Sequence, residues 1–220
     1  MHITGRHTTE NTNRLYLVRH GESWTNVAHQ LSHKLLDYSL TPKGALQAQH
    51  TAEYFKGREI AEICTSPLKR AVETAEIIAE PLGLHVVVLE NFREVNVGVL
   101  ETQQTAESWA LDDSIVADWL SGNVERAFPG GEDYVTLLTR VQSGVERVIA
   151  GKTDQNIIIV GHYGVFTTPF GDICRNVDAK QLRRIRNRNC SISEVVVGLH
   201  NGRLEGELIN WASHDHLRSG

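Results

Sequence analysis

The chain has 220 residues, of which 40% are hydrophobic and 22% are charged, a balance typical of a globular protein with its own core. Its formal net charge of −5 argues against a nucleic-acid-binding surface, so an anionic ligand would need a local cluster of cations. No apolar run is long enough to span a membrane, and three widely spaced cysteines favour reduced thiols in the cytoplasm over disulfides or a zinc site.

Strand-like and helix-like patterns alternate along the chain. Residues 1–13 are polar and are expected to form a flexible leader, and residues 14–220 a single domain. The predicted strands are Arg14–Val18, Glu62–Thr65, His85–Leu89, Asn156–Val160, Ser193–Leu199 and Leu204–Asn210. Asn201-Gly202 predicts a tight antiparallel hairpin between the last two strands. The expected fold is α/β, a three-layer sandwich whose mostly parallel central sheet has helices on both faces.

Capping residues and prolines mark the predicted helix starts. Thr41-Pro42 and Ser66-Pro67 each place a capping hydroxyl before a proline at the first helical position. Another helix is expected to start near Gly131 or Glu132 and to end at Gly151. The stretch Glu101–Phe128 has a less regular pattern than the rest of the chain.

Imidazole and cationic side chains follow three of the predicted strands. Arg19-His20-Gly21 follows the first, Ser66 to Arg70 follows the second, and Gly161-His162-Tyr163 follows the fourth. Ligands of open α/β sheets bind at the carboxyl ends of the strands, so two histidines and two arginines should converge in one crevice. Such a group can hold a phosphate dianion and leave one imidazole free to attack it. Arg70 lies in the first turn of its predicted helix, where the helix dipole disfavours cations, and this favours a functional role.

In this order and spacing the residues resemble the histidine phosphatase superfamily, also called the phosphoglycerate mutase-like family, from Arg19 to about Leu217. The matching motifs are Arg19-His20-Gly21-Glu22-Ser23 with Asn26, Leu40-Thr41-Pro42-Lys43-Gly44, Ser66-Pro67-Leu68-Lys69-Arg70-Ala71 with Glu73-Thr74-Ala75, Arg93-Glu94 with Gly98 and Glu101, Pro129-Gly130-Gly131-Glu132 and Gly161-His162-Tyr163-Gly164. The set covers nearly the whole chain.

The resemblance implies a metal-independent phosphatase that needs no cofactor and in which His20 is the nucleophile, forming a phosphohistidine intermediate. Arg19, Arg70 and His162 would bind the phosphoryl oxygens, and Asn26 would add a hydrogen bond.

Glu94 would protonate the leaving alkoxide and then activate water. That role requires a carboxyl group that holds a proton near neutral pH, so its pKa is expected to be raised by partial burial or by the substrate. Glu22, Glu101 and Glu132 are rival acids. However, Glu22 is expected to pair with an arginine, and Glu132 is expected to lie in the first turn of a helix.

The segment Asn96–Thr102 looks like the phosphatase-type branch and lacks the aromatic and basic residues of cofactor-dependent mutases. We therefore expect a phosphomonoester hydrolase for a small phosphorylated metabolite. A cofactor-dependent phosphoglycerate mutase is the alternative, and a non-catalytic phospho-ligand-binding protein is less expected because the nucleophile and the acid are both present. The oligomeric state stays open, with a homodimer as one possibility.

Two histidine pairs could suggest a metal, His29 with His33 and His214 with His216, but neither has a third ligand at a recognised zinc spacing. We expect no metal site. His29 and His33 are instead expected near the substrate mouth.

Two segments are expected to cover the crevice and set specificity, Val27–Ser39 and Glu101–Pro129. Trp109 and Trp119 should cover part of the core, and Tyr163 is expected to bind substrate and narrow the mouth.

Overall fold

One mixed sheet forms the centre of the protein in a computed structural model, which describes residues 12–103 and 105–217. Within these residues the strands follow the order β3-β2-β4-β1-β5-β6 across the sheet. They are β1 (Thr12–Arg19), β2 (Ile60–Thr65), β3 (Val86–Val88), β4 (Asn156–Gly161), β5 (Ile192–His200) and β6 (Arg203–Ser213). The first four run parallel to one another, and β5 and β6 add an antiparallel edge next to β1.

Each predicted strand is present, with ends shifted by a few residues. The predicted hairpin is confirmed, because His200 pairs with Arg203 and both Asn201 and Gly202 adopt positive φ angles, 50° and 76°. The expected leader lies mostly outside the described residues. Its last two residues, 12 and 13, already belong to β1, where they pair with β5.

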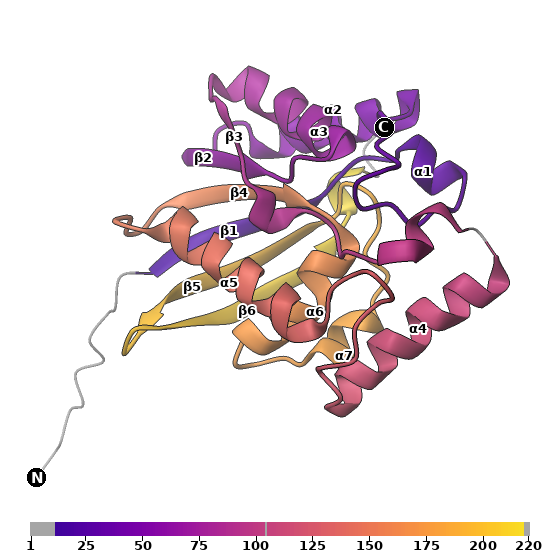
Figure 1. Cartoon of the computed structure of the whole chain (residues 1–220). Coiled ribbons are helices and arrows are strands. Elements are labelled where there is room, and N and C mark those ends of the chain that lie inside the picture. The colour runs from indigo at the N-terminus through magenta and orange to yellow at the C-terminus, as the bar shows by residue number, and fades with distance from the viewer. Residues whose placement is uncertain (1–11, 104, 218–220) are drawn as a thin grey trace, which may run out of the picture.

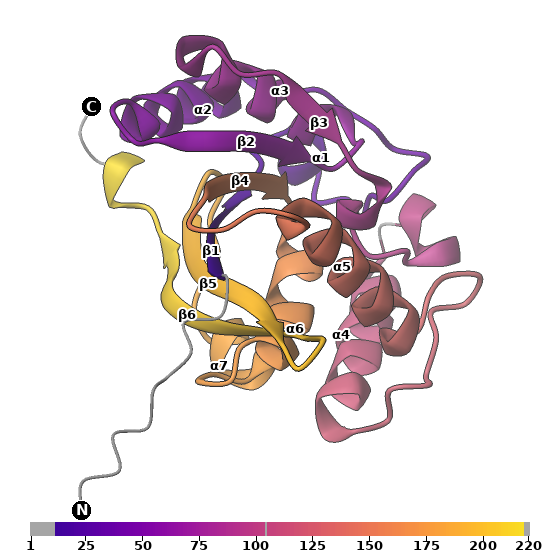
Figure 2. The same cartoon turned by 90° about the vertical axis from the view of Figure 1, so that its left-hand side faces the viewer.

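Helices cover both faces of the sheet (Figures 1 and 2). α2 (Pro42–Phe55) and α3 (Lys69–Ala79) pack on one face, and α5 (Tyr134–Ile149) and α6 (Tyr163–Ile173) pack on the other. Successive side chains of β1 point to opposite faces, so Leu15 and Leu17 join the α5 and α6 core. Tyr16 and Val18 join the core under α2 and α3. The predicted three-layer α/β sandwich is confirmed.

The remaining elements are short or lie at the rim. They are α1 (Trp24–Val27), α4 (Ala106–Ser121), α7 (Ala179–Arg183) and the 3-10 turns η1 (Glu80–Leu82), η2 (Glu90–Phe92), η3 (Gly98–Thr102) and η4 (Asp215–Leu217). In the described ranges no helix is both long and apolar enough to cross a membrane.

The predicted start of α2 is confirmed, but that of α3 is wrong. The Thr41 side chain accepts a hydrogen bond from the Gly44 N–H and caps α2 as expected. α3 begins at Lys69 after Leu68, later than Ser66-Pro67 suggests. The Ser66 hydroxyl accepts from the Leu68 N–H at 3.3 Å, just before the helix, and contacts an imidazole described below, so α3 begins without a side-chain cap.

Two further predictions for the second half of the chain are corrected. α5 begins at Tyr134, because the Asp133 side chain accepts a hydrogen bond from the Thr136 N–H and serves as the cap. The stretch Glu101–Phe128 contains α4, a helix of 16 residues. Trp119 on α4 is buried in the core as expected, but Trp109 is 38% exposed.

The sheet brings three strand ends to one place. In the register of the ladder, Arg19 at the end of β1 lies opposite Gly161 of β4, and Thr65 of β2 lies opposite Val160. The residues that follow these strands therefore share one edge of the sheet, as expected for parallel strands.

Candidate active site

His20 follows β1, and its imidazole is only 3% exposed. Its Nδ1 lies 2.7 Å from the Gly21 carbonyl oxygen, and its Nε2 lies 3.1 Å from Nε of Arg70. A carbonyl oxygen can only accept, so Nδ1 carries the proton and Nε2 accepts from the Arg70 N–H. His20 therefore presents a neutral imidazole whose lone pair is on Nε2, the form required of a nucleophile.

Arg70 holds a fixed position beside that nitrogen. Its Nη1 donates to the Ser32 hydroxyl at 2.9 Å and its Nη2 donates to the Ser32 carbonyl at 3.1 Å. Burial above all lowers the pKa of Arg70 to about 10, while the carboxylates of Glu94 and Asp37 oppose the change. The guanidinium therefore stays charged at neutral pH and faces the pocket as a cation.

Two buried nitrogens near His20 lack a hydrogen-bond partner among the described residues, Nε of Arg19 and Nδ1 of His162. The other ring nitrogen of His162 lies 2.7 Å from the Ser66 hydroxyl, and its ring centre lies 5.1 Å from that of His20. Arg19 also donates through Nη1 to the Asn187 carbonyl. Buried polar groups are normally paired. Two unpaired ones beside a nucleophile indicate a place for a polar ligand.

The pKa values of His20 and His162 both lie well below the ordinary 6.5. Burial is the main cause, and the positive charge of Arg70 is the next. Both imidazoles are therefore neutral at neutral pH. The positive charge of the pocket comes from its guanidinium groups.

Asn26 lies at the rim of the same cavity as His20. Its Oδ1 accepts hydrogen bonds from the Asn189 side-chain amide at 3.0 Å and from the Ser23 N–H at 3.1 Å. The same Asn189 amide donates to the His20 carbonyl at 3.1 Å. Asn26 thus stands near the nucleophile, with its oxygen used to hold the loop.

The turn after His20 packs tightly on the start of α2. The Gly21 N–H donates to the Thr74 hydroxyl at 3.0 Å, and that hydroxyl donates to the Arg70 carbonyl at 2.7 Å. A Cβ on Gly21 would lie 2.5 Å from the carbonyl oxygen of Gly44, which is closer than real Cβ contacts come. The sequence therefore needs glycine here for the nucleophile to sit where it does.

Glu94 comes from the loop after η2 and lines the same cavity as His20 and Arg70, a cavity of about 430 Å³. Its Oε1 accepts from the N–H groups of Val95 at 2.9 Å and Val165 at 3.0 Å, and its Oε2 accepts from Gly164 at 3.2 Å. The carboxyl group thus sits at the amino end of α6, where the helix dipole favours negative charge.

Gly164 allows this approach. A Cβ at position 164 would lie 2.7 Å from Oε1 of Glu94 and 2.7 Å from Cγ2 of Val95. The carboxyl group reaches the helix end only because residue 164 has no side chain.

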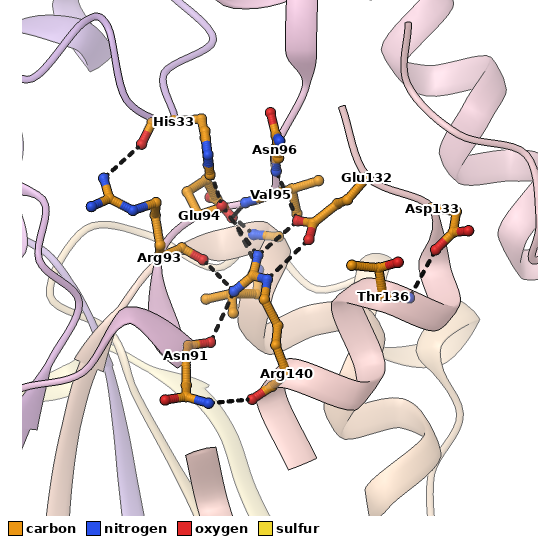
Figure 3. A network of polar contacts seen from close by, with 12 residues as sticks. His33, Asn91, Arg93, Glu94, Val95, Asn96, Glu132, Asp133, Thr136 and Arg140 are labelled. Atoms are coloured by element: carbon orange, nitrogen blue, oxygen red, sulfur yellow. Dashed lines mark hydrogen bonds and ion pairs between the residues drawn. The ribbon is translucent and has the colours of Figure 1, made fainter. Parts of the chain in front are cut away.

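Arg140 of α5 fixes the loop that carries Glu94 (Figure 3). Its Nη1 donates to the carbonyls of Asn91 and Arg93, both at 2.8 Å, and its Nη2 donates to the carbonyl of Glu94 at 3.2 Å. The other side of the guanidinium is bidentate to Glu132, at 2.7 and 3.0 Å. One half-buried arginine therefore ties three carbonyl groups of the loop to α5.

The rival acids all have structural partners. Glu132 lies before α5, not in its first turn as predicted, and its carboxylate pairs with Arg140 and accepts from the Asn96 N–H. Glu22 pairs with Lys43 at 2.7 Å, not with an arginine.

Glu101 is only 4% exposed, and its Oε1 accepts from four successive backbone N–H groups, His33 to Leu36. Burial opposes ionisation of Glu101, but these four donors outweigh it and lower its pKa. Glu101 thereby holds the segment that places Ser32 beside Arg70.

One histidine of each pair makes a polar contact with a neighbouring residue. Nδ1 of His33 lies 2.8 Å from the Glu94 carbonyl, and Nε2 of His216 lies 3.1 Å from the Thr51 hydroxyl. His29 lines the wider cavity described below, as expected for the mouth, whereas His33 lines neither that cavity nor the one that holds His20. Within the described residues no three His, Cys, Asp or Glu side chains are grouped as metal ligands would be.

Tyr163 begins α6 and stands at the mouth between two guanidinium groups. The guanidinium carbon of Arg19 lies 6.0 Å from its ring centre, and that of Arg183 lies 5.7 Å from it. Tyr163 lines both the 430 Å³ cavity and a second, wider cavity of about 1050 Å³ that also contains Arg19 and Asn26.

The family model described as the histidine phosphatase superfamily, branch 1, matches residues 15–211. The chain belongs to this superfamily. It is 34% identical over 182 residues to a "Probable phosphoglycerate mutase GpmB" of Proteus mirabilis, covering 83% of this chain and 84% of the relative.

Two solved structures share the fold of this chain. A mycobacterial glucosyl-3-phosphoglycerate phosphatase complexed with VO3 is 25% identical, with a TM-score of 0.75 over 91% of this chain and 99% of that one. YhfR of Bacillus stearothermophilus is 23% identical, with a TM-score of 0.78 over 93% and 99% of the two chains. At 23% identity, the likeness to YhfR shows a shared fold and nothing more.

The structure thus brings His20, Arg19, Arg70, His162 and Glu94 of this superfamily member around one pocket, with Asn26 and Tyr163 at its rim. Sequence reasoning missed the groups that hold them: Ser32, Ser66, Thr74, Arg140 and Asn189. Ser66 and Thr74 stand inside recognised motifs and could have been found. The other three reach the site only through tertiary folding.

Proposed function

We propose that the protein hydrolyses a phosphomonoester of a small metabolite through a phosphohistidine on His20. The observation that carries this proposal is the buried Nε2 lone pair of His20, which lies beside Arg70 and near two buried nitrogens without partners. A phosphoryl group offers the oxygens that Arg19, Arg70 and His162 would bind. Membership of the histidine phosphatase superfamily supports the same reading.

In the first step the Nε2 lone pair attacks phosphorus. A P–N bond forms while the P–O bond to the leaving alcohol breaks, and the leaving oxygen takes a proton from Glu94. The N–H groups around Glu94 favour its carboxylate in the free protein, and the bound phosphate dianion would favour the protonated form that this step needs. Arg70, which donates to Nε2 in the free protein, would turn its N–H toward a phosphoryl oxygen. Two guanidinium groups stabilise the equatorial oxygens, so we expect full activity in EDTA.

In the second step Glu94, now a carboxylate, takes a proton from water as the water oxygen attacks phosphorus. The P–N bond breaks and its electron pair returns to Nε2, which releases inorganic phosphate and regenerates the enzyme.

Trapping the intermediate tests the proposal. A radiolabelled phosphomonoester mixed with the protein and quenched in alkali should leave an acid-labile label on the wild type, and none on His20→Ala. Steady-state hydrolysis of p-nitrophenyl phosphate by His20→Ala should fall by about 10⁴-fold or more. His85→Ala, before β3 and outside both cavities, is the matched control. Turnover by His20→Ala near the wild-type rate would overturn the proposed nucleophile.

A phosphoglycerate mutase is the second candidate, because the curated relative of Proteus mirabilis carries that name. The chemistry differs only in the acceptor, a second substrate hydroxyl instead of water. 3-Phosphoglycerate with catalytic bisphosphoglycerate separates the two reactions. We expect inorganic phosphate as the main product, and rapid formation of 2-phosphoglycerate without free phosphate would favour the mutase.

A further inference from the structure

The wider cavity beside the phosphoryl pocket is strongly basic although the protein as a whole is acidic. Among the described residues that line it, six are arginine or lysine and one, Glu22, carries a carboxylate. That carboxylate is already paired with Lys43. The formal charge of the whole chain is −5, so this concentration of cations is local.

Four of these cations come from the last residue of α7 and the short segment that follows it: Arg183, Arg184, Arg186 and Arg188. Arg183 is partly buried and the other three are exposed. In the described part of the chain none of the four forms an ion pair. Four neighbouring guanidinium groups without carboxylate partners repel one another, and an anionic ligand would relieve that repulsion.

The segment is fixed to the catalytic turn by the residues between the arginines. The Asn187 carbonyl accepts from Arg19, and the Asn187 side chain accepts from the Ser191 hydroxyl. Asn189 donates to the His20 carbonyl, and the Cys190 N–H donates to the Arg19 carbonyl at 2.9 Å. The exposed guanidinium groups thus stand at a set place relative to His20.

Arg183 and Tyr163 connect the two cavities. Both residues line the wider cavity and the phosphoryl pocket, and the Arg183 guanidinium lies against the Tyr163 ring. A ligand bound in the phosphoryl pocket can therefore extend past Tyr163 into the arginine-lined space.

We propose that the arginine segment 183–188 is a second anion subsite, and that the preferred substrate carries a second phosphate group beyond the one transferred to His20. The inference rests on the proposed phosphatase function. A phosphate dianion fits the forked donors of several arginines better than a single carboxylate does.

A matched substrate series tests the subsite. Monophosphates of alkane diols of increasing chain length are compared with the corresponding bisphosphates and with phosphorylated hydroxy acids that end in a carboxylate. For one chain length we expect kcat/KM for the bisphosphate to exceed that for the monophosphate by about tenfold or more. The ratio should fall toward one in the double variant Arg186→Gln/Arg188→Gln.

Arg203→Gln is the matched control. Arg203 is exposed and lies at the hairpin next to the start of β1, at the end of the sheet away from His20, so the ratio should keep its wild-type value. A ratio near one in the wild type, or a high ratio that survives in the double variant, would overturn the subsite. Preference for the carboxylate series would overturn its assignment to phosphate.

Binding measurements keep the two proposals distinguishable. Alkane bisphosphonates and monophosphonates resemble the substrates but cannot be hydrolysed, and calorimetry with them needs no turnover. If p-nitrophenyl phosphate is not hydrolysed, the proposed function fails. The subsite proposal is still supported if the bisphosphonate binds the wild type about tenfold more tightly than the monophosphonate does, and this difference is lost in the double variant. Equal binding of the two compounds would reject it.

Discussion

The two halves of the active site are built in different ways. In the phosphoryl half His20, Arg70 and His162 follow strands of the central sheet, and their contacts come from neighbouring strand ends and helix starts. In the acid half Glu94 sits on a loop that two helices hold from outside, Arg140 of α5 and the amino end of α6. The groups that attack and bind phosphorus are therefore positioned by the strands of the sheet. The proton donor is instead positioned by residues that are distant from it in the sequence.

The sharpest test of the phosphoryl half is Arg70→Gln. Arg70 touches Nε2 of His20 and is expected to bind phosphoryl oxygens, so kcat should fall about 10³-fold for good and poor leaving groups alike. Rates with p-nitrophenyl phosphate and an alkyl phosphate measure this. Arg203→Gln serves as the control. A loss confined to alkyl phosphates would place Arg70 in the acid half instead.

Glu94→Gln should slow the phosphorylation of His20 much more for substrates with poor leaving groups than for substrates with good ones. A proton donor matters most when the leaving alkoxide is basic, so phosphorylation of His20 by an alkyl phosphate should slow by about 10²-fold or more. Phosphorylation by p-nitrophenyl phosphate should change much less. Rapid-quench measurement of the first turnover isolates this step from the water step. Equal losses for both substrates would argue against Glu94 as the acid.

Arg140→Gln should reproduce the Glu94 pattern at reduced size. Losing the contacts to the loop displaces Glu94, and we expect phosphorylation by alkyl phosphates to slow about tenfold with little change for p-nitrophenyl phosphate. Glu132, only 7% exposed, would lose its partner, so unfolding in urea should show a loss of about 3 kcal/mol.

Two variants control that result. Glu132→Gln/Arg140→Gln removes the unpaired charge and should regain part of the stability but not the alkyl phosphate rate. Arg126→Gln breaks a partly exposed pair with Asp118 and should change stability by less than about 1 kcal/mol. If Arg140→Gln slowed the turnover of every substrate equally, Arg140 would affect both halves of the site, and the proposed separation between them would be wrong.

The smallest expected effect is on the pH dependence of stability. The pKa of His162 in the folded protein lies well below 6.5. Below about pH 6.5 the unfolded chain therefore binds a proton at this histidine that the folded protein does not bind, and stability falls as pH falls. Between about pH 7.5 and pH 5.5 this histidine should contribute a loss of about 1.4 kcal/mol. Urea unfolding of His162→Gln should show a correspondingly shallower pH dependence than the wild type. Parallel curves would contradict the neutral, buried imidazole.

The sequence predicted the phosphoryl half better than the acid half for a physical reason. Strands buried on both faces have a continuous apolar pattern, so their ends are readable, and the parallel sheet then places Arg19, Arg70 and His162 together. Ser66 misled the prediction of the start of α3, because its hydroxyl serves His162 and leaves the helix without a side-chain cap.

The misread residues of the acid half share one cause: their partners are far away in the sequence. Glu132 was read as part of a helix, because its bidentate contact with Arg140 has no local signature. α4 escaped notice because its apolar residues do not form one continuous buried stripe, and Trp109 faces the mouth while Trp119 faces the core. Contacts of this kind follow from the packed fold and not from periodicity.

The bare α-carbon of Gly164 gives the experimenter a handle on the reaction. A methyl group there would collide with the Glu94 carboxyl group and with Val95, yet it lies outside the contacts that hold the His20 imidazole. A displaced Glu94 can neither protonate the leaving oxygen nor activate water, so Gly164→Ala should bind the intact phosphate ester and cleave it slowly. Such a protein is a substrate trap. Mass spectrometry of the phosphate esters that it retains from a metabolite extract would identify the natural substrate.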